Sequence, residues 1–385
     1  MKTGYTFDAR IESLAAGGAG VLRLEGRAFF MERCAPGDLV RGRVTALNGA
    51  WGRAELVGLL EASPDRAEPF CGLYGRCGGC GLQHVAYRTQ LAEKKNMVMD
   101  ALSRIGGLSY TQEFALVPGA PLEYRNRMRF HSLGASRGAP GIPGLKERRG
   151  NAVVALEDCP VSDPGIRRAL RNKSLVVPPG KKNFAVYSRE DTFLSEGGRR
   201  RGAVSIAGKR LVLDAAVFFQ SNAALLEILI QDILKAADGA DTKLPAADVF
   251  AGVGTFSAFL ETIFPRMDLV EENKAALALA SENLKKDARF FPLKDYEWAS
   301  RCGDAYGFMV LDPPRGGLSP YFSEFLVERG APLLAYVSCN PATLARDAKL
   351  LAGAYTLSSL KAYDFYPQTP HIECLAVFTR EKGAL

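Results

Sequence analysis

The sequence predicts an α/β protein that ends in a Rossmann-like domain. From about residue 216 onward, helical and strand patterns alternate, which is typical of βαβ units around a parallel sheet. Residues 1–60 instead contain short strand patterns separated by glycine-rich turns, as in a small OB-like β-barrel. The 385 residues are too many for one ordinary core. We therefore expect a barrel over residues 1–60, a mixed central domain over 61–215 and the α/β domain over 216–385.

The expected barrel carries basic and aromatic residues whose role stays open. Arginines along its strands, with Phe29, Phe30 and Trp51 nearby, would suit a face that binds single-stranded nucleic acid. The alternative is a solvated surface with the aromatic side chains in the core, and the sequence favours neither interpretation. The expected strands are residues 5–11, 20–24, 27–31, 39–47 and 51–59. The arginines are Arg23, Arg27, Arg33, Arg41, Arg43 and Arg53.

The central region combines a linker, a helix and a strand-rich stretch. Residues 61–69 are polar and contain proline, which predicts a linker. Residues 88–105 have helical spacing, and two glycines end that pattern. The stretch 124–215 indicates mixed structure rich in strands. Loops rich in glycine and proline are expected near 134–144 and 178–181.

The carboxyl-terminal region supplies the alternating elements of the α/β domain. Its short apolar runs are typical of buried parallel strands, and helical spacing separates them. The expected helices are residues 223–237, 255–262 and 274–283. The expected strands are residues 247–250, 267–270, 307–311, 333–337 and 375–378.

Composition and charge bound the class of protein. Hydrophobic residues make up 47% of the chain and charged residues 24%, which is typical of a soluble globular protein. No apolar stretch is long enough to span a bilayer and the first residues form no secretory signal, so we expect a cytoplasmic protein. The net charge of +7 permits an anionic partner without proving one. In a reducing compartment, eight cysteines favour metal binding or catalysis over disulfides.

Three cysteines lie close together in a glycine-rich segment. Cys71, Cys77 and Cys80 are separated by five and two residues, and Cys159 is the candidate fourth ligand. Four thiolates suit either a structural zinc ion or an iron–sulfur cluster. The uneven spacing and the proline after Cys159 favour a [4Fe–4S] cluster, because zinc more often binds two CxxC pairs. His84 in place of Cys159 would complete a zinc site instead.

A glycine-rich loop after an expected strand indicates a cofactor site. Residues 248–256 contain Gly252 and Gly254, which permit a tight turn and a close approach of backbone to ligand. Glu271 ends the next strand, where a carboxylate can accept hydrogen bonds from ribose hydroxyls. A dinucleotide loop would have a third glycine and an NTPase loop a lysine, and this segment has neither. The pattern favours S-adenosylmethionine, with an ordinary glycine turn as the alternative.

A thiol follows the strand expected at residues 333–337. Asn340 and Pro341 force a turn after Cys339, which places the thiol at the rim of the sheet, where ligands bind in open α/β folds. That position suits a nucleophile. The alternative is a small buried hydrophobe, the commoner role of a free cysteine.

Two acids complete a candidate reaction site. Asp312 follows the strand expected at 307–311, and the two prolines after it fix it over the carboxyl edge of the sheet. Arg315 stands where amino-directed methyltransferases have an aromatic residue, which argues against their chemistry. Glu373 precedes the last strand and suits a general base, although alone it would be taken for a solvated loop carboxylate. Methylation of uracil at C5 needs such a set, because a thiolate must add to C6 and a base must later remove the C5 proton.

These motifs, in this order, resemble the RNA uracil-5-methyltransferase family, and in particular its bacterial 23S ribosomal RNA members. The resemblance covers nearly the whole chain, and residues 1–60 are similar to a TRAM domain. Further motifs that carry it are Tyr124-Arg125-Asn126-Arg127, Phe218-Phe219-Gln220-Ser221-Asn222, Asp312-Pro313-Pro314-Arg315, Ser338-Cys339-Asn340-Pro341 and His371-Ile372-Glu373.

The resemblance implies roles for individual residues. Cys339 would be the nucleophile, Glu373 the base for the C5 proton and Asp312 the acid that holds the target base. The cofactor would contact Gln220, Phe250, Gly252, Gly254, Glu271, Asp295 and Asp312, with Asp304 competing against Asp295 for the adenine. The [4Fe–4S] ligands would be Cys71, Cys77, Cys80 and Cys159, and the RNA contacts Arg125, Arg127 and Phe218.

The implied substrate is RNA. We expect 23S rRNA, because a TRAM-like domain and a cluster occur together, with the T-loop of tRNA as the alternative. The target uridine would have to leave its stack to reach the thiol. We expect a monomer without membrane contact. A radical S-adenosylmethionine enzyme would need CxxxCxxC spacing, DNA cytosine-5 methylation would need a Pro-Cys loop, and an intact thiol and base argue against a non-catalytic RNA-binding protein.

Overall fold

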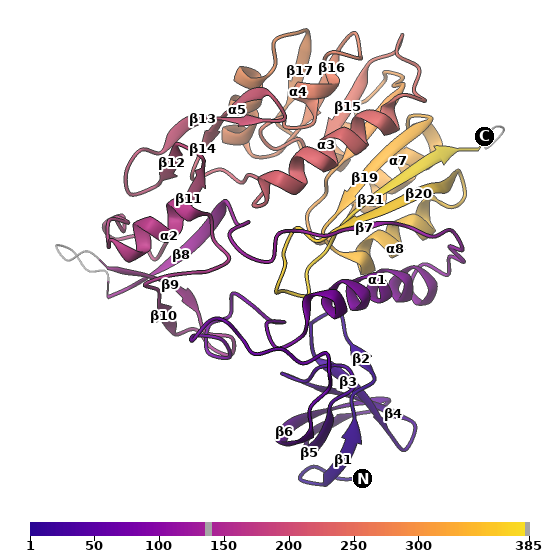
Figure 1. Ribbon diagram of the computed structural model, residues 1–385. Coiled ribbons are helices and arrows are strands. Elements are labelled where there is room, and N and C mark those ends of the chain that lie inside the picture. The colour runs from indigo at the N-terminus through magenta and orange to yellow at the C-terminus, as the bar shows by residue number, and fades with distance from the viewer. Residues whose placement is uncertain (135–140, 382–385) are drawn as a thin grey trace. The chain divides into compact units, whose positions relative to one another are not determined.

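The computed structural model describes residues 1–134 and 141–381, which form two compact units (Figure 1). Unit 1 comprises Met1–Val98, Gly144–Ala155 and Tyr366–His371, and unit 2 comprises the remaining residues. The division into three domains expected from the sequence stays a prediction. Within the described ranges, no helix is long and apolar enough to cross a membrane.

Unit 1 begins with a β domain, as the sequence predicts. Its strands are β1 (Thr6–Arg10), β2 (Ser13–Leu14), β3 (Gly20–Leu24), β4 (Arg27–Met31), β5 (Leu39–Asn48) and β6 (Trp51–Glu61). They form one sheet in the order β1-β5-β6-β4-β3-β2, in which only β4 and β6 pair in parallel. The pairing of β5 with β6 shifts register at three places. Such irregularities increase local twist and bend, so this sheet can curl around its own core.

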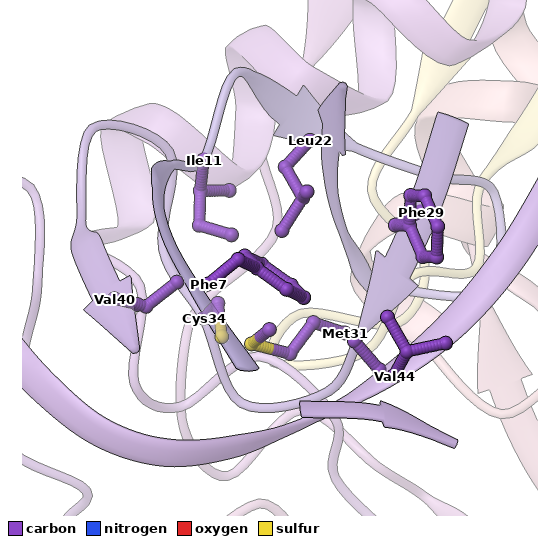
Figure 2. Close-up of a cluster of buried hydrophobic side chains, with 9 residues drawn as sticks. Phe7, Ile11, Leu22, Phe29, Met31, Cys34, Val40 and Val44 are labelled. Atoms are coloured by element: carbon purple, nitrogen blue, oxygen red, sulfur yellow. The ribbon is translucent and has the colours of Figure 1, made fainter. Parts of the chain in front are cut away.

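Alternation along these strands sends one face of the sheet into a core, shown in Figure 2. Phe29 lies fully inside it, with its ring centroid 6.2 Å from that of Phe7. Phe30 and Trp51 are half-buried, with ring centroids 6.0 Å apart. The core interpretation therefore applies to Phe29. The side chains of Phe30 and Trp51 are partly exposed and stay available to a ligand. The core residues are Phe7, Ile11, Leu22, Phe29, Met31, Cys34, Val40, Val44 and Ala54.

The segment expected as a linker is anchored to the β domain. Asp38 is fully buried and accepts hydrogen bonds from the backbone N–H groups of Ala35 at 2.6 Å and Ser63 at 2.9 Å. The Arg66 guanidinium lies 2.8 Å from the same carboxylate. A buried carboxylate is stable only with such partners. The start of this segment is thus fixed by Asp38 rather than free.

One helix and two strands that lie mostly in unit 1 follow the β domain. The helix α1 (Tyr87–Arg104) lies within one residue of the prediction, and its Met97 packs with Leu14 of the β domain in a second apolar cluster. The strands β9 (Ile142–Lys146) and β10 (Val153–Ala155) pair antiparallel.

Unit 2 contains the predicted Rossmann-like sheet. Its strands are β7 (Leu116–Val117), β15 (Ala246–Val249), β16 (Met267–Val270), β17 (Ala288–Phe291), β18 (Phe308–Leu311), β19 (Leu333–Ser338), β20 (Tyr355–Tyr363) and β21 (Glu373–Arg380). The order is β17-β16-β15-β18-β19-β21-β20-β7, with β15 to β19 parallel and β21 antiparallel to both neighbours. From β15 the chain proceeds outward on one side to β16 and on the other to β18. Ligands bind at such a switch point in open α/β sheets.

Helices connect these strands. They are α3 (Ala223–Ala237), α4 (Ser257–Leu260), α5 (Lys274–Asn283), α6 (Asp295–Ala299), α7 (Pro320–Arg329) and α8 (Pro341–Leu351). The sequence predicted α3 and α5 with these bounds. It placed a longer helix at 255–262, but the amide of Ile263 bonds to the carbonyl of Leu260, three residues back, so irregular turns replace the last part of that helix.

The central stretch is strand-rich, as expected. It contains β8 (Arg127–Leu133), α2 (Pro164–Arg171), β11 (Asn183–Arg189), β12 (Thr192–Ser195), β13 (Arg201–Ile206) and β14 (Lys209–Asp214). β11 pairs antiparallel with β8 and β12, and β13 pairs with β14. The loop expected near 178–181 is present. The other expected loop includes residues 135–140, which lie outside the described residues.

Candidate active site

One edge of the unit 2 sheet collects the three predicted catalytic residues. Asp312 directly follows β18, and Cys339 directly follows β19. Glu373 is the first residue of β21, which starts two residues before the expected strand. Because β21 runs antiparallel to β19, its beginning lies at the edge where the parallel strands end. All three side chains therefore belong to the same sheet edge.

The register of β19 and β21 brings the thiol and the expected base together. Ser338 and Cys374 are partners in the antiparallel ladder. Cys339 directly follows Ser338 and Glu373 directly precedes Cys374, so the thiol and the carboxyl lie at the same end of the two paired strands. On its other side, Glu373 is paired with Tyr363 of β20, so two neighbouring strands fix its backbone.

A tight turn holds Cys339 at the rim. The N–H of Asn340 donates to Oγ of Ser338 at 3.2 Å, and that hydroxyl donates back to the carbonyl of Asn340 at 3.1 Å. Asn340 then caps α8, because its Oδ1 accepts from the N–H of Ala342 at 3.1 Å. Pro341 is the first helical residue, a position that suits its fixed φ. The sequence predicted the turn but not the helix that begins in it.

Burial and negative charge act together on the pKa values of Cys339 and Glu373. Burial, with the charges of Glu373 and Asp312, raises the pKa of the Cys339 thiol to about 11. Burial and the charge of Asp312 also raise the pKa of Glu373 well above its usual range. Arg315 is exposed and opposes both shifts. The resting site therefore holds a neutral thiol, and a positive charge placed beside it would favour the thiolate.

Arg315 is the functional candidate that sequence reasoning missed. The Asp-Pro-Pro-Arg segment was interpreted through its acid and through the missing aromatic residue, not through the cation. The carbonyl of Arg315 accepts a hydrogen bond from Nδ2 of Asn340 at 3.2 Å, which links this segment to the turn that carries the thiol. An arginine directly after Asp312-Pro313-Pro314 was the available signal.

The predicted cofactor loop folds sharply after β15. Phe250, Gly252 and Gly254 have φ values of +69°, +55° and +72°. The N–H groups of Phe250 and Ala251 both bond to the carbonyl of Val270 in β16, at 2.8 and 3.1 Å. A side-chain carbon at Gly252 would meet only open space, so a ligand can approach its backbone.

Two carboxylates border this loop. Glu271 accepts from the N–H groups of Gly252 at 3.0 Å and Asn273 at 2.8 Å, so it ties the loop to the end of β16. Asp248 is fully buried, and its Oδ2 accepts from Oγ of Ser257 at 2.6 Å. Its other oxygen has no hydrogen-bond partner, and burial raises the pKa of Asp248 to about 7. Carboxylates around the loop, one of which has an oxygen without a hydrogen-bond partner, suit a ligand that carries positive charge and hydroxyl groups.

Gln220 links the expected cofactor segment to Asp312. It is buried, and its Nε2 donates to Oδ2 of Asp312 at 3.3 Å. Burial and the charge of Asp248 raise the pKa of Asp312 to about 7, while the hydrogen bond from Gln220 opposes that shift. Next to it, Asn222 caps α3 through the N–H of Leu225.

Asn126, between the two predicted RNA-binding arginines, anchors this same segment. Its N–H donates to the carbonyl of Ser221 at 2.7 Å, and its Oδ1 accepts from the N–H of Ala223 at 2.9 Å. The predicted RNA residues Arg127 and Phe218 are also brought together, with the guanidinium carbon 5.4 Å from the ring centroid. Phe218 is 58% exposed, so the ring offers a surface for stacking. Arg125 neighbours this group, with Nε 3.4 Å from the carbonyl of Arg127.

The two candidates for the adenine contact differ in their surroundings. Asp295 is buried at the start of α6 and accepts from the N–H of Ser319 at 3.0 Å. Asp304 is half-exposed and forms ion pairs with Arg266 and Arg289. Those arginines also form ion pairs with Asp268, the second residue of β16. Asp304 is thus already part of an ion-pair network, which favours Asp295 as the contact to the adenine.

The cysteine-rich segment forms a compact loop in unit 1. The N–H of Tyr74 bonds to the carbonyl of Cys71 at 2.9 Å, and the N–H of Gly79 points to Sγ of Cys77 at 3.4 Å. Cys159 belongs to unit 2. Throughout the described chain, no three His, Cys, Asp or Glu side chains gather as a metal-binding group. His84 is buried, and burial lowers its pKa to about 4.

The geometry of the cofactor loop predicts a difference between its two glycines. In Gly254→Ala, the new Cβ would lie 3.0 Å from Ala280 Cβ and from Leu284 Cδ1, in a backbone conformation that already disfavours side chains. We expect the free energy of unfolding to fall by about 2–4 kcal/mol. In Gly252→Ala the new Cβ would meet no atoms, so backbone strain alone should lower the free energy of unfolding by about 1 kcal/mol. Urea unfolding of both variants measures this, and equal losses would contradict the close packing at Gly254.

Known proteins of one kind match this chain along most of its length. The family described as tRNA (Uracil-5-)-methyltransferase matches residues 284–381. The 23S rRNA (uracil(1939)-C(5))-methyltransferase RlmD of Pseudomonas entomophila is 30% identical, over 96% of this chain and 92% of that protein. An uncharacterized RNA methyltransferase of Treponema denticola is also 30% identical, over 92% and 94%.

A solved structure matches the fold. The tRNA (uracil-54, C5)-methyltransferase of Pyrococcus abyssi, in complex with S-adenosyl-L-homocysteine, aligns with a TM-score of 0.71 and 23% identity, over 97% of this chain and 99% of that one. The fold, the order of the motifs and the near full-length relatives agree. This chain belongs to the RNA uracil-5-methyltransferase family.

Proposed function

We propose that this enzyme methylates C5 of a uridine in 23S rRNA, with Cys339 as nucleophile and Glu373 as the base that removes the C5 proton. The observation that supports the proposal is the ladder of β19 and β21, because the thiol adjoins its last pair on one strand and a buried carboxyl adjoins the same pair on the other. The relative named as a 23S rRNA enzyme supports the substrate. The tRNA enzyme of the same fold makes tRNA the second candidate.

The residues at the sheet edge divide the reaction among them. Cys339 Sγ, as thiolate, bonds to C6 of the uracil, and the displaced electron pair makes C5 a nucleophile. C5 then accepts the methyl group. Glu373 takes the proton from C5, the C5–C6 double bond re-forms, and the thiolate leaves. Asp312, held by Gln220, would bind the edge of the target base.

S-adenosylmethionine would supply a methyl group on a positively charged sulfur. The open space at Gly252 leaves room for the approach of a ligand to the loop, and Glu271 and Asp312 present carboxylates at the same sheet edge. Gln220 and Asp295 complete the proposed cofactor contacts. A cation bound among these carboxylates would also favour the Cys339 thiolate over the resting thiol.

RNA would be held by charge and by stacking. In unit 2, Arg125, Arg127 and the exposed ring of Phe218 form one candidate contact. In unit 1, the TRAM-like β domain offers the half-buried pair Phe30 and Trp51, with the Arg53 guanidinium 5.9 Å from the Trp51 ring centroid. Aromatic rings with arginine are the usual platform for unpaired bases.

We further propose that Cys71, Cys77, Cys80 and Cys159 hold a [4Fe–4S] cluster. Three thiols in one short loop, with an N–H directed at Cys77 Sγ, fit the donor set and the amide contacts of such clusters. The three thiols of the loop would have to draw together around the metal. Iron and acid-labile sulfide in protein prepared without oxygen test this, and Cys77→Ser should lose both. Zinc instead of iron would favour the alternative.

The direct test of substrate uses labelled S-adenosylmethionine and RNA that lacks 5-methyluridine. We expect label in 23S rRNA, recovered as 5-methyluridine after digestion. Label in tRNA alone would keep the chemistry and overturn the substrate. Label in neither would overturn the proposed activity and leave an RNA-binding protein as the remaining candidate.

Arg315 should set the pH dependence of this reaction. Because the thiol has a raised pKa, its thiolate fraction and the rate should increase with pH between about pH 6 and 9. Arg315→Met removes a charge that lowers the pKa of Cys339 and Glu373, so the rate at neutral pH should fall and the pH profile should move upward. Since Arg315 is exposed, we expect less than about a tenfold change, smaller still at high salt.

The matched control for that experiment is Arg315→Lys, which keeps the charge. Its pH profile should stay close to that of the parent enzyme. A shift of the same size in both variants would mean that Arg315 acts through its shape and not through its charge.

A further inference from the structure

Two charged residues of α8 hold the loop that carries Arg315. Residues 313–319, here called the Arg315 loop, lead from the end of β18 to α7. Arg346 and Asp347 are neighbours on α8, which begins two residues after Cys339. Asp347 is fully buried, whereas Arg346 is exposed. A buried carboxylate is stable only with hydrogen-bond or ionic partners, so the contacts of Asp347 show which segments it joins.

Both oxygens of the Asp347 carboxylate are used. Its Oδ2 accepts from the N–H of Leu318 at 2.9 Å and from the hydroxyl of Tyr336 at 2.7 Å. Its Oδ1 accepts from Nε and Nη2 of Arg346, at 2.8 and 2.6 Å. Tyr336 belongs to β19, the strand that leads to the thiol. One carboxylate therefore joins the Arg315 loop to the strand before the thiol and to the helix after it.

Arg346 binds the same loop next to Arg315. Its Nη2 donates to the carbonyl of Gly316, the residue that follows Arg315, at 2.9 Å. The loop also packs closely at Gly317, whose φ is +76°. A side-chain carbon on Gly317 would meet Oδ2 of Asp347 and Nη2 of Arg346. The loop therefore has little room to shift while this ion pair is intact.

Arg315 is also bonded to the turn of the thiol. Its carbonyl accepts from Nδ2 of Asn340 at 3.2 Å, and Asn340 directly follows Cys339. With Arg346 bonded to the next carbonyl of the loop, the backbone of Arg315 is fixed on both sides. The place of this cation matters, because the interaction energy of two charges falls with the distance between them.

Charged and titratable groups from three strands act on the Cys339 thiol. Burial and the charges of Glu373, on β21, and Asp312, after β18, raise its pKa, whereas the charge of Arg315 lowers it. Cys374 of β21 is fully buried, and burial with the charge of Glu373 raises its pKa, so it stays neutral. Arg315 thus offsets two carboxylates, and the extent depends on where its loop lies.

We propose that Arg346 and Asp347 are positioning residues that keep the Arg315 cation near the Cys339 thiol. The proposal rests on the proposed function for the role of Cys339, but it concerns the formation of the thiolate and not methyl transfer. The ion pair sets the path of the Arg315 loop, and that path sets the distance from guanidinium to sulfur. Loss of the pair should therefore imitate loss of the Arg315 charge.

The experiment measures the Cys339 thiolate without RNA. A thiolate reacts with iodoacetamide, since its sulfur bonds to the methylene carbon and iodide leaves, whereas the neutral thiol is unreactive. Mass spectrometry of the peptide that contains Cys339 gives the rate of this alkylation between about pH 7 and 10. In Arg346→Met we expect the rate at neutral pH to fall about two- to fivefold, and the whole profile to move to higher pH. Arg315→Met should cause a loss at least as large.

A double variant shows whether the effect passes through Arg315. If Arg346 acts by positioning Arg315, the two losses should not multiply, and Arg315→Met, Arg346→Met should react as fast as Arg315→Met alone. Losses that multiply would mean that Arg346 acts on the thiol through its own charge, which would overturn the proposal.

Gly317→Ala is a second variant, and it keeps every charge. Its new Cβ would push the loop away from Arg346 and Asp347, so it should slow alkylation even if Arg346→Met folds poorly. Tyr336→Phe is the matched control, because it removes one hydrogen bond of Asp347 and leaves the bonds of the Arg315 loop in place. It should lower the melting temperature and keep the pH profile of the parent enzyme.

Three further outcomes would contradict the proposal. A parent-like profile in both Arg346→Met and Gly317→Ala would mean that the pair does not set the position of the cation. Slower alkylation in Tyr336→Phe would indicate a general loosening around β19. An unchanged rate in Arg315→Met would mean that this cation does not act on the thiol. Methyl transfer is a separate measurement: if the alkylation pattern is as expected but no RNA is methylated, the proposed function fails and this inference stands.

Discussion

Cys339→Ala should abolish methyl transfer and leave the fold intact. Without the thiolate, C5 of uracil is not activated, so the rate should fall by about 10⁴-fold or more, as when other enzymes lose a nucleophile. The residue is only partly buried and its turn is held by Ser338 and Asn340, so the free energy of unfolding should change by no more than about 1 kcal/mol. Label transfer to RNA measures the loss of turnover. Attack of the thiolate is measured with 5-fluorouridine RNA, because a base cannot remove fluorine from C5 and the covalent adduct therefore persists on denaturing gels.

The neighbouring thiol provides the control for that variant. Cys374 is fully buried on β21 and is the ladder partner of Ser338. Cys374→Ala should cost stability by leaving a small cavity, yet it should keep adduct formation. If Cys339→Ala still formed an adduct, or if Cys374→Ala lost it in a folded protein, the nucleophile would be assigned to the wrong cysteine.

The elements that sequence reasoning found are those whose signals are local. α5 begins at a cap, because Asn273 accepts from the N–H groups of Ala275 and Ala276, and it ends at Asn283 as expected. Short buried runs identified β16 and β18, because a strand covered on both faces is apolar throughout. Strand ends followed by glycine, proline or an acid likewise pointed to the sheet edge on which Asp312 and Cys339 lie.

The parts that were missed depend on partners far along the chain. The expected pattern put Glu373 in a loop before the last strand, because no local feature fixes the register of β21 against β19. α8 was missed because Asn340 and Pro341 were interpreted only as a turn, although Pro341 is also the first residue of a helix. Residues 366–371 belong to unit 1, where Gln368 accepts a hydrogen bond from Gln90, 278 residues away in sequence. Pairings of that kind are set by packing and cannot be inferred from periodicity.

Glu373→Gln should stop turnover and accumulate the covalent intermediate on ordinary uridine RNA. The side chain is 2% exposed, and a glutamine amide has nearly the same shape and volume as the carboxyl that it replaces. The fold should tolerate the change. Without a base the C5 proton stays in place, and turnover should fall about 10²- to 10⁴-fold. Denaturing gels of enzyme with labelled uridine RNA measure the trapped fraction.

The same substitution should make the first step easier, which distinguishes a base from a merely structural carboxyl. The charge of Glu373 is one cause of the raised pKa of Cys339, so its removal should lower that pKa and increase the thiolate fraction at neutral pH. Adduct formation with 5-fluorouridine RNA should therefore be at least as fast as in the parent enzyme, while turnover on uridine RNA fails. The double variant Cys339→Ala, Glu373→Gln should form no adduct. Slower adduct formation in Glu373→Gln would contradict this division of roles, because the carboxylate would then be needed to activate the thiol and not only to remove the C5 proton.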